Sequence, residues 1–158
     1  MNALVAYFSA SGSTAKLAKT VAAAANAAIY EIRPAVPYQR GDLNWMNKKA
    51  RSTVEMADPN FRVPMADSTA PVAEADVIFV GFPIWWYREP SIIDTFLEAY
   101  DFSGKTVIPF FTSGGSGLGE GQGRMESLAK GANVCAGKRF RSGANEQEIK
   151  SWIDSLAL

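Results

Sequence analysis

Hydroxyl side chains gather around one glycine early in the chain. The segment Ser9-Ala10-Ser11-Gly12-Ser13-Thr14 follows an apolar run and precedes a stretch with helical periodicity. Gly12 permits a tight turn, in which successive backbone N–H groups can point at one anion. The positive end of a helix dipole favours negative charge at the same place. The loop contains no Lys or Arg. It therefore indicates either a terminal phosphate held by amides and hydroxyls alone or an ordinary Ser/Thr-rich turn that caps a helix.

Three consecutive aromatic residues follow another apolar run. Trp85, Trp86 and Tyr87 come soon after Pro83. Adjacent side chains rarely all point into a core, so at least one large ring should be exposed or face a ligand. Flat aromatic surfaces suit stacking on a planar heteroaromatic ring. The alternative is that Trp85 or Trp86 packs under a neighbouring helix.

Glycine dominates a third loop, Thr112-Ser113-Gly114-Gly115-Ser116-Gly117. Without side-chain bulk, backbone N–H and C=O groups can approach the edge of a bound ring. A flexible loop without a ligand would have the same composition, so the pattern is compatible with both interpretations.

The elements that position these loops alternate between strand and helix. Apolar runs predict strands near residues 4–8, 28–32, 77–80, 106–111 and 133–136. Helical periodicity predicts helices after residues 14, 90 and 145, a short one around residues 125–128, and another that Asp42 caps and that reaches Val54. This alternation predicts an α/β fold, with a parallel sheet covered by helices on both faces. All three loops then lie beyond the carboxyl ends of strands, where such sheets bind ligands.

Composition excludes several kinds of chemistry. The 158 residues include 16 Lys+Arg, 16 Asp+Glu, one Cys and no His. The lack of His removes the commonest general base near neutral pH and the commonest zinc ligand. A single cysteine, Cys135, excludes an internal disulfide or a CxxC pair, and its place in a predicted buried strand favours a core role. The balanced charge gives no reason to expect nucleic acid or a membrane as a partner.

No linker, repeat or low-complexity tract divides the chain, so we expect one domain over residues 1–158. The N-terminal residues lack the basic and long apolar regions of a signal peptide, which favours a cytoplasmic location.

Taken together, these features resemble the flavodoxin family. The segment from Ser9 to Thr14 fits the family's phosphate loop, and the strand alternation matches its sheet order 2-1-3-4-5 in a three-layer sandwich. Trp45, the pattern Arg51-Ser52-x-x-Glu55, and the segments 81–86 and 112–117 are similar to those of a subgroup of short bacterial flavodoxin-like proteins.

The resemblance implies FMN as the cofactor and implies a role for each loop. The phosphate would be held by Ser9, Ser11, Gly12, Ser13 and Thr14. The isoalloxazine ring would be flanked by Pro83, Ile84, Trp85 and Trp86. Its other edge would be lined by Thr112, Ser113, Gly114 and Gly115.

Two departures from the family pattern bear on function. Flavodoxins are usually acidic, which steers them to basic redox partners, whereas this chain has no net charge. Flavodoxins also often place Gly after the loop aromatic, so that a peptide can flip toward the reduced flavin. Here Trp86-Tyr87-Arg88 follows Trp85, and a positive φ at a non-glycine residue costs roughly 1 kcal/mol or more. We therefore expect weaker stabilisation of the one-electron-reduced flavin.

Three functions remain open from the sequence. The first is an FMN electron carrier, with no catalytic residue of its own, that serves a redox partner protein or a small electron acceptor. The second is an NAD(P)H-dependent FMN oxidoreductase acting on quinones or other small acceptors. In that case a nucleotide phosphate could bind to Arg33, Arg40, Arg51 or Arg62, which are otherwise surface charges.

The third function is a flavin-binding module without turnover, in which Arg51 and Glu55 merely pair along one helix face. Exposed aromatic residues at the crevice would be compatible with a monomer or a homodimer. Trp45 could reach the flavin or anchor the core, and the core is the favoured interpretation.

Overall fold

A parallel sheet forms the centre of the molecule. The computed structural model describes residues 2–141 and 143–158. Its strands run in the order β2-β1-β3-β4-β5, and β6 also pairs with β4. This order confirms the predicted topology. The strand bounds are β1 Ala3–Tyr7, β2 Ala28–Glu31, β3 Val77–Pro83, β4 Thr106–Thr112, β5 Asn133–Val134 and β6 Lys138–Phe140.

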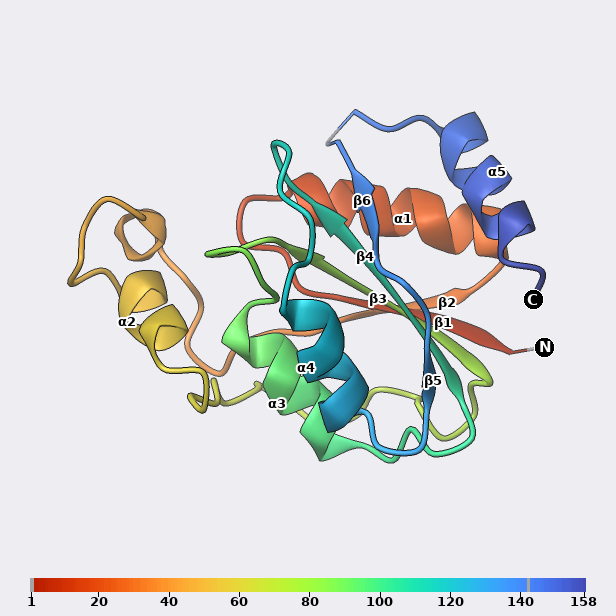
Figure 1. The fold of residues 1–158 in the computed structure, drawn as a ribbon, viewed down its shortest axis with the longest axis horizontal. Coiled ribbons are helices and arrows are strands. Elements are labelled where there is room, and N and C mark those ends of the chain that lie inside the picture. The colour runs from red at the N-terminus through yellow and green to blue at the C-terminus, as the bar shows by residue number, and fades with distance from the viewer. Residues whose placement is uncertain (1, 142) are drawn as a thin grey trace.

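Helices cover both faces of the sheet (Figure 1). On one face lie α1 (Ser13–Ala25) and α5 (Glu146–Ser155), and on the other lie α3 (Ser91–Ala99) and α4 (Gly121–Leu128). Alternate residues of each strand enter two separate cores, so that β3 sends Ile78 to the α3 side and Phe79 to the α1 side. Both faces of the central strands are therefore apolar, as the continuous runs in the sequence predict.

The helix predicted after residue 145 begins at a side-chain cap. The Asn145 side chain accepts a hydrogen bond of 2.8 Å from the Glu148 backbone N–H. The Glu148 carboxylate lies 3.4 Å from Arg141. Ile149 and Trp152 then face the sheet, and Trp152 packs edge-on against Phe140.

The fifth predicted strand is interrupted in the structure. The apolar pattern predicts one strand near residues 133–136, whereas β5 ends at Val134 and β6 begins at Lys138. The Gln122 side chain on α4 donates to Cys135 O (3.0 Å) and accepts from Gly137 N (2.9 Å). One amide thus satisfies the backbone groups at the break. Cys135 is only partly buried there, and that burial raises the pKa of its thiol.

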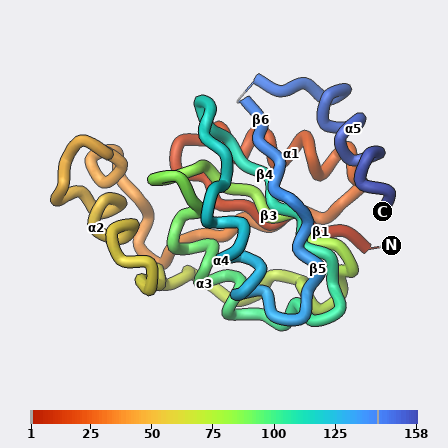
Figure 2. Tube along the Cα trace, in the orientation of Figure 1, coloured from red at the N-terminus to blue at the C-terminus, as the bar shows by residue number. Residues whose placement is uncertain are grey.

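The interval between β2 and β3 carries a projecting segment, residues 40–57, which we call the lobe (Figures 1 and 2). It contains a short 3-10 helix, η1 (Arg40–Leu43), and the helix α2 (Arg51–Ala57). The single helix expected from Asp42 to Val54 is wrong. Asn44 and Asn47 accept bonds from backbone N–H groups two residues on, and these local turns interrupt the helix. Asp42 instead pairs with the Gln39 backbone.

No helix of the described residues is long and apolar enough to cross a membrane.

Candidate functional site

The loop between β1 and α1 ends at a helix terminus whose amides have no side-chain cap. Gly12 precedes α1 with φ of +97°, a conformation that favours glycine, and space around its Cα is open. Gly12 N–H donates to Ser9 Oγ at 3.1 Å, which holds the turn. Ser11 is exposed and Ser13 half-buried. The loop thus fits a phosphate, because uncapped N–H groups and exposed hydroxyls meet the positive end of the helix.

Hydrogen bonds join this loop to the other two. Thr14 is buried, and its Oγ1 lies 3.0 Å from Thr112 Oγ1 at the end of β4. Ile84 N–H donates to Thr112 O at 3.0 Å. Thr112 is therefore the common contact of the three loops, and the structure brings the predicted site residues to one edge of the sheet.

The second loop, the aromatic segment of residues 83–87, is a tight turn with unusual backbone angles. Trp85 and Arg88 exchange two backbone hydrogen bonds of 3.0 and 3.2 Å. Between them, Trp86 has φ of +47° and Tyr87 has φ of +65°. The sequence predicts that a positive φ would be costly here; the structure already contains it at both residues, which is strain that L-residues seldom carry.

The two tryptophans of this turn have different environments. Trp85 packs edge-on against Phe8 (5.5 Å between ring centroids) and Tyr38 (5.4 Å). Trp86 is 38% exposed and Tyr87 is 74% exposed. Trp85 therefore packs partly buried against the core through Phe8 and Tyr38, which lie outside the helices, rather than under a helix, while its neighbour Trp86 remains free to meet a ligand. Pro83 is the last residue of β3.

The glycine-rich loop is organised by one serine. Ser113 Oγ donates to Ser116 O (2.6 Å) and accepts from Gly115 N (3.3 Å) and from Arg139 Nε (3.2 Å). This hydroxyl therefore holds the loop together. Gly114 and Gly115 are exposed, and no atom approaches the position of a Cβ at either. Their backbone remains accessible at the mouth of the crevice.

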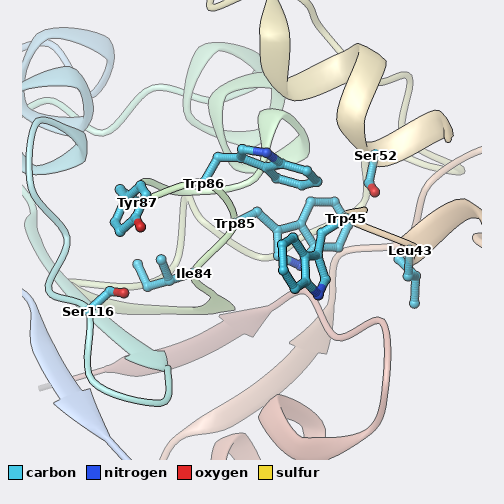
Figure 3. A pocket seen from close by; sticks show the side chains of 8 residues that line it. All are labelled: Leu43, Trp45, Ser52, Ile84, Trp85, Trp86, Tyr87 and Ser116. Atoms are coloured by element: carbon cyan, nitrogen blue, oxygen red, sulfur yellow. The ribbon is translucent and has the colours of Figure 1, made fainter. Parts of the chain in front are cut away.

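A pocket of about 350 Å³ opens between the second loop, the third loop and the lobe (Figure 3), and none of residues 9–14 lines it. Its lining combines the second loop, the third loop and the lobe: Leu43, Trp45, Ser52, Ile84, Trp85, Trp86, Tyr87 and Ser116. Trp45 is 72% exposed. The favoured prediction that Trp45 anchors the core is wrong, because the lobe holds it outside the body of the protein. Flat rings on several sides suit a planar heteroaromatic ligand.

A buried group of charges behind the turn was missed by the sequence analysis. Arg124 donates to Glu89 Oε2 (3.1 Å) and to Asp94 Oδ2 (2.6 Å), and neither carboxylate is exposed. Arg88, nearly buried, lies 3.7 Å from Asp94 Oδ2. Burial, together with the neighbouring Asp94, raises the pKa of Glu89 to about 8. Only the sequence neighbourhood of Arg88-Glu89, directly after the aromatic residues, could have drawn attention to it.

The arginines considered for a nucleotide phosphate mostly have carboxylate partners. Arg33 bonds Asp67 at 2.7 Å and Arg51 bonds Glu55 at 2.8 Å, four residues on along α2. Arg62 pairs with Glu98, and Arg40 is exposed. Arg139 on β6, which no sequence motif marks, brings a cation to the third loop.

The fold and this edge define a class of protein. A doubly wound parallel sheet, an uncapped phosphate-type loop after the first strand and an aromatic crevice beyond the third are the features of a mononucleotide-binding α/β protein. The model of the flavodoxin family matches residues 2–156. The chain belongs to the flavodoxin family.

Solved structures agree with this assignment. A proposed flavoprotein from Bacteroides eggerthii is 41% identical, with a TM-score of 0.92, over 99% of this chain and 98% of that one. One from Bacteroides uniformis is 45% identical, with a TM-score of 0.91 and 97% of both chains covered. A flavoprotein from Lactobacillus acidophilus in complex with FMN shares the fold at 20% identity, with a TM-score of 0.70 over 99% of both chains. A search of curated proteins found no match.

Proposed function

We propose that this protein binds FMN and serves as an electron carrier. The observation that supports the proposal is the Thr14–Thr112 contact, which joins the uncapped start of α1 to the end of β4, the strand that leads into the pocket residue Ser116. Membership of the flavodoxin family and the FMN complex of the Lactobacillus relative support the choice of cofactor.

The protein's own groups have distinct tasks in this proposal. Backbone amides at the start of α1, with Ser11 and Ser13, hold the phosphate in the positive field of the helix. Ile84 and Trp86 lie beside the ring, and the open backbone at Gly114 and Gly115 approaches its edge. Bound FMN supplies the electron-transfer chemistry. Because the rings of Trp86 and Tyr87 are exposed, a donor or acceptor of electrons can reach the site from their side.

The arginine contacts favour a carrier over an NAD(P)H oxidoreductase. Arg33, Arg51 and Arg62 already bind carboxylates, so a nucleotide phosphate at any of these three would have to displace an existing partner. We expect NADPH to reduce the FMN-loaded protein slowly, and a redox protein or a chemical reductant to reduce it readily. Rapid bleaching by NADPH with turnover of a quinone would instead establish the oxidoreductase.

Titration of the apoprotein with FMN and with riboflavin tests the phosphate loop. FMN should bind much more tightly, because riboflavin lacks the phosphate. Ser11→Asp adds a negative charge to an exposed loop position. It should weaken FMN binding at least about tenfold while leaving riboflavin binding unchanged.

Ser68→Asp, at an exposed loop position outside the site, is the matched control. Since an acidic residue near a helix N-terminus favours the helix, Ser11→Asp should remain folded. Equal FMN affinity in Ser11→Asp and Ser68→Asp would place the phosphate elsewhere.

A further inference from the structure

The lobe supplies one side of the aromatic pocket. Leu43, Trp45 and Ser52 line the pocket from the lobe, whereas the remaining lining residues come from the second and third loops. Figure 3 shows these side chains around the pocket, with Ser52 extending from α2. A planar ring beside Ile84 and Trp86 would therefore meet a second surface that belongs to a different part of the chain.

Ser52 has an unused hydroxyl at this surface. The residue is 1% exposed, and no partner for its Oγ lies within hydrogen-bonding distance in the described part of the chain. A buried hydroxyl without a partner destabilises a folded protein. Because Ser52 lines the pocket, a ligand atom that accepts a hydrogen bond would supply the missing partner.

Trp45 has an exposed ring at the same surface. It lines the pocket with 72% of its surface accessible. Isolated exposed hydrophobic residues are common, but here a second exposed indole, that of Trp86, lines the same pocket. Two indoles at one pocket offer flat apolar surface to a planar ligand.

Hydrogen bonds and ring packing to the rest of the chain hold the lobe in position. Arg88 Nη2 donates to Met56 O at the end of α2 (3.2 Å), and Arg51 Nη1 donates to Val36 O (2.7 Å). The Tyr38 hydroxyl bonds to Glu55 on α2, and the Tyr38 ring packs against Trp85. The same residues that shape the second loop thus fix α2 and Ser52, so the two sides of the pocket keep a defined spacing.

We propose that the lobe is the second wall of a planar-ring site, in which Trp45 stacks on the ring and Ser52 Oγ donates to a carbonyl oxygen at the ring's edge. The proposal rests on the proposed FMN function. Two sources share this chemistry: the isoalloxazine ring of the cofactor and a quinone acceptor that binds beside it.

Ser52→Ala and Trp45→Ala test the wall, each beside a matched control. Thr53→Ala removes a neighbouring hydroxyl of α2 that also has no partner in the described residues but does not line the pocket. Met46→Ala removes an exposed side chain next to Trp45, again outside the lining. The probes are lumiflavin, a flavin ring without ribityl chain or phosphate, on the apoprotein and menadione on the FMN-loaded protein.

We expect Ser52→Ala to weaken probe binding roughly 2- to 10-fold, the range of one net hydrogen bond. Trp45→Ala should weaken it about 10-fold through lost stacking. Ser52→Ala and Thr53→Ala should both leave the urea midpoint of the apoprotein unchanged or higher, because each removes an unpaired buried hydroxyl. A gain in stability with a loss of affinity is a signature that a purely structural role of Ser52 would not produce.

The outcomes separate the two proposals. Weaker lumiflavin binding assigns the wall to the flavin ring, and weaker menadione binding alone assigns it to the acceptor. If Ser52→Ala and Trp45→Ala bind both probes as tightly as their controls do, the proposal that the lobe forms a second wall is wrong. Tight FMN binding in the same experiment would leave the cofactor proposal intact. Failure of the wild-type protein to bind FMN would overturn the proposed function itself.

Discussion

Trp86 and Tyr87 show how single residues store strain beside the candidate site. Both have positive φ, in a turn closed by the backbone bonds between Trp85 and Arg88. Such turns normally place Asn and Gly at the two central positions. The large rings are kept despite the strain, and they line the pocket. Backbone strain of this kind clusters at functional sites in proteins, and here it presents two large rings to the pocket.

Tyr87→Gly should relieve part of this strain. Glycine adopts positive φ freely, whereas an L-residue loses roughly 1–2 kcal/mol there. Glycine also gains entropy in the unfolded chain, so we expect a net stabilisation of at most about 1 kcal/mol. Tyr87 is 74% exposed, so little packing is lost. Urea denaturation measures the change.

Val36→Gly is the comparison, since Val36 is 67% exposed and its φ is not positive. This substitution should destabilise the protein by about 0.5–1 kcal/mol. If Tyr87→Gly destabilises to the same extent, the turn carries no strain that glycine can release.

At the scale of helices, the buried cluster of Glu89, Asp94 and Arg124 connects α3, α4 and the chain after α2. Arg124 on α4 bonds Asp94 on α3 and Glu89 just before it, and its Nη2 donates to Pro59 O at 2.8 Å. Gly121 on α4 lets the helix approach, because a Cβ there would lie 2.6 Å from Glu89 Oε1. One guanidinium therefore holds three parts of the chain behind the aromatic turn.

Arg124→Met should lower the free energy of unfolding by about 3–5 kcal/mol, because it leaves a buried Asp94 carboxylate without its closest cation. Arg141→Met is the control, since the Arg141–Glu148 pair is exposed and such pairs contribute about 1 kcal/mol or less. Chemical denaturation of both variants gives the comparison. Similar small losses in the two would show that the buried cluster does not hold the elements together.

Across the whole molecule, stability should depend on pH in a direction set by two carboxyl groups. Bonds from Tyr30 and Arg33 lower the pKa of Asp67 to about 2, so its contribution is lost as the pH falls below about 4. Burial raises the pKa of Glu89 to about 8. In the unfolded chain the Glu89 carboxyl releases its proton near the ordinary pKa of a glutamate, whereas the folded protein retains this proton up to about pH 8.

Stability should consequently fall as the pH rises from about 5 to 8, since the folded state binds more protons than the unfolded state in that range. Glu89→Gln should flatten this part of the profile, because the amide mimics the protonated carboxyl and does not titrate. Glu126→Gln, at an exposed position of α4, should leave the profile as in the wild type. Urea midpoints across the range test this, and a wild-type slope in Glu89→Gln would show that another group is responsible.

The amino-acid sequence alone indicated a parallel α/β sheet and the approximate place of the site, whereas the order of the strands was implied by the resemblance to flavodoxins. Continuous apolar strands and amphipathic helices are local patterns, and the carboxyl ends of parallel strands must share an edge. The loops at Gly12, Trp85 and Gly114 could therefore be predicted from the sequence to lie at one edge of the sheet. The resemblance to flavodoxins rested on the same segments.

The tertiary structure decided what those local patterns could not. Whether Trp45 enters the core depends on where Asn44 and Asn47 turn the chain, and the Gln122 amide decides where the last strand is interrupted. The cluster of Glu89, Asp94 and Arg124 joins residues up to 35 positions apart. Such contacts depend on how helices pack in space, and side-chain pairing across that packing leaves no periodic signal in the sequence.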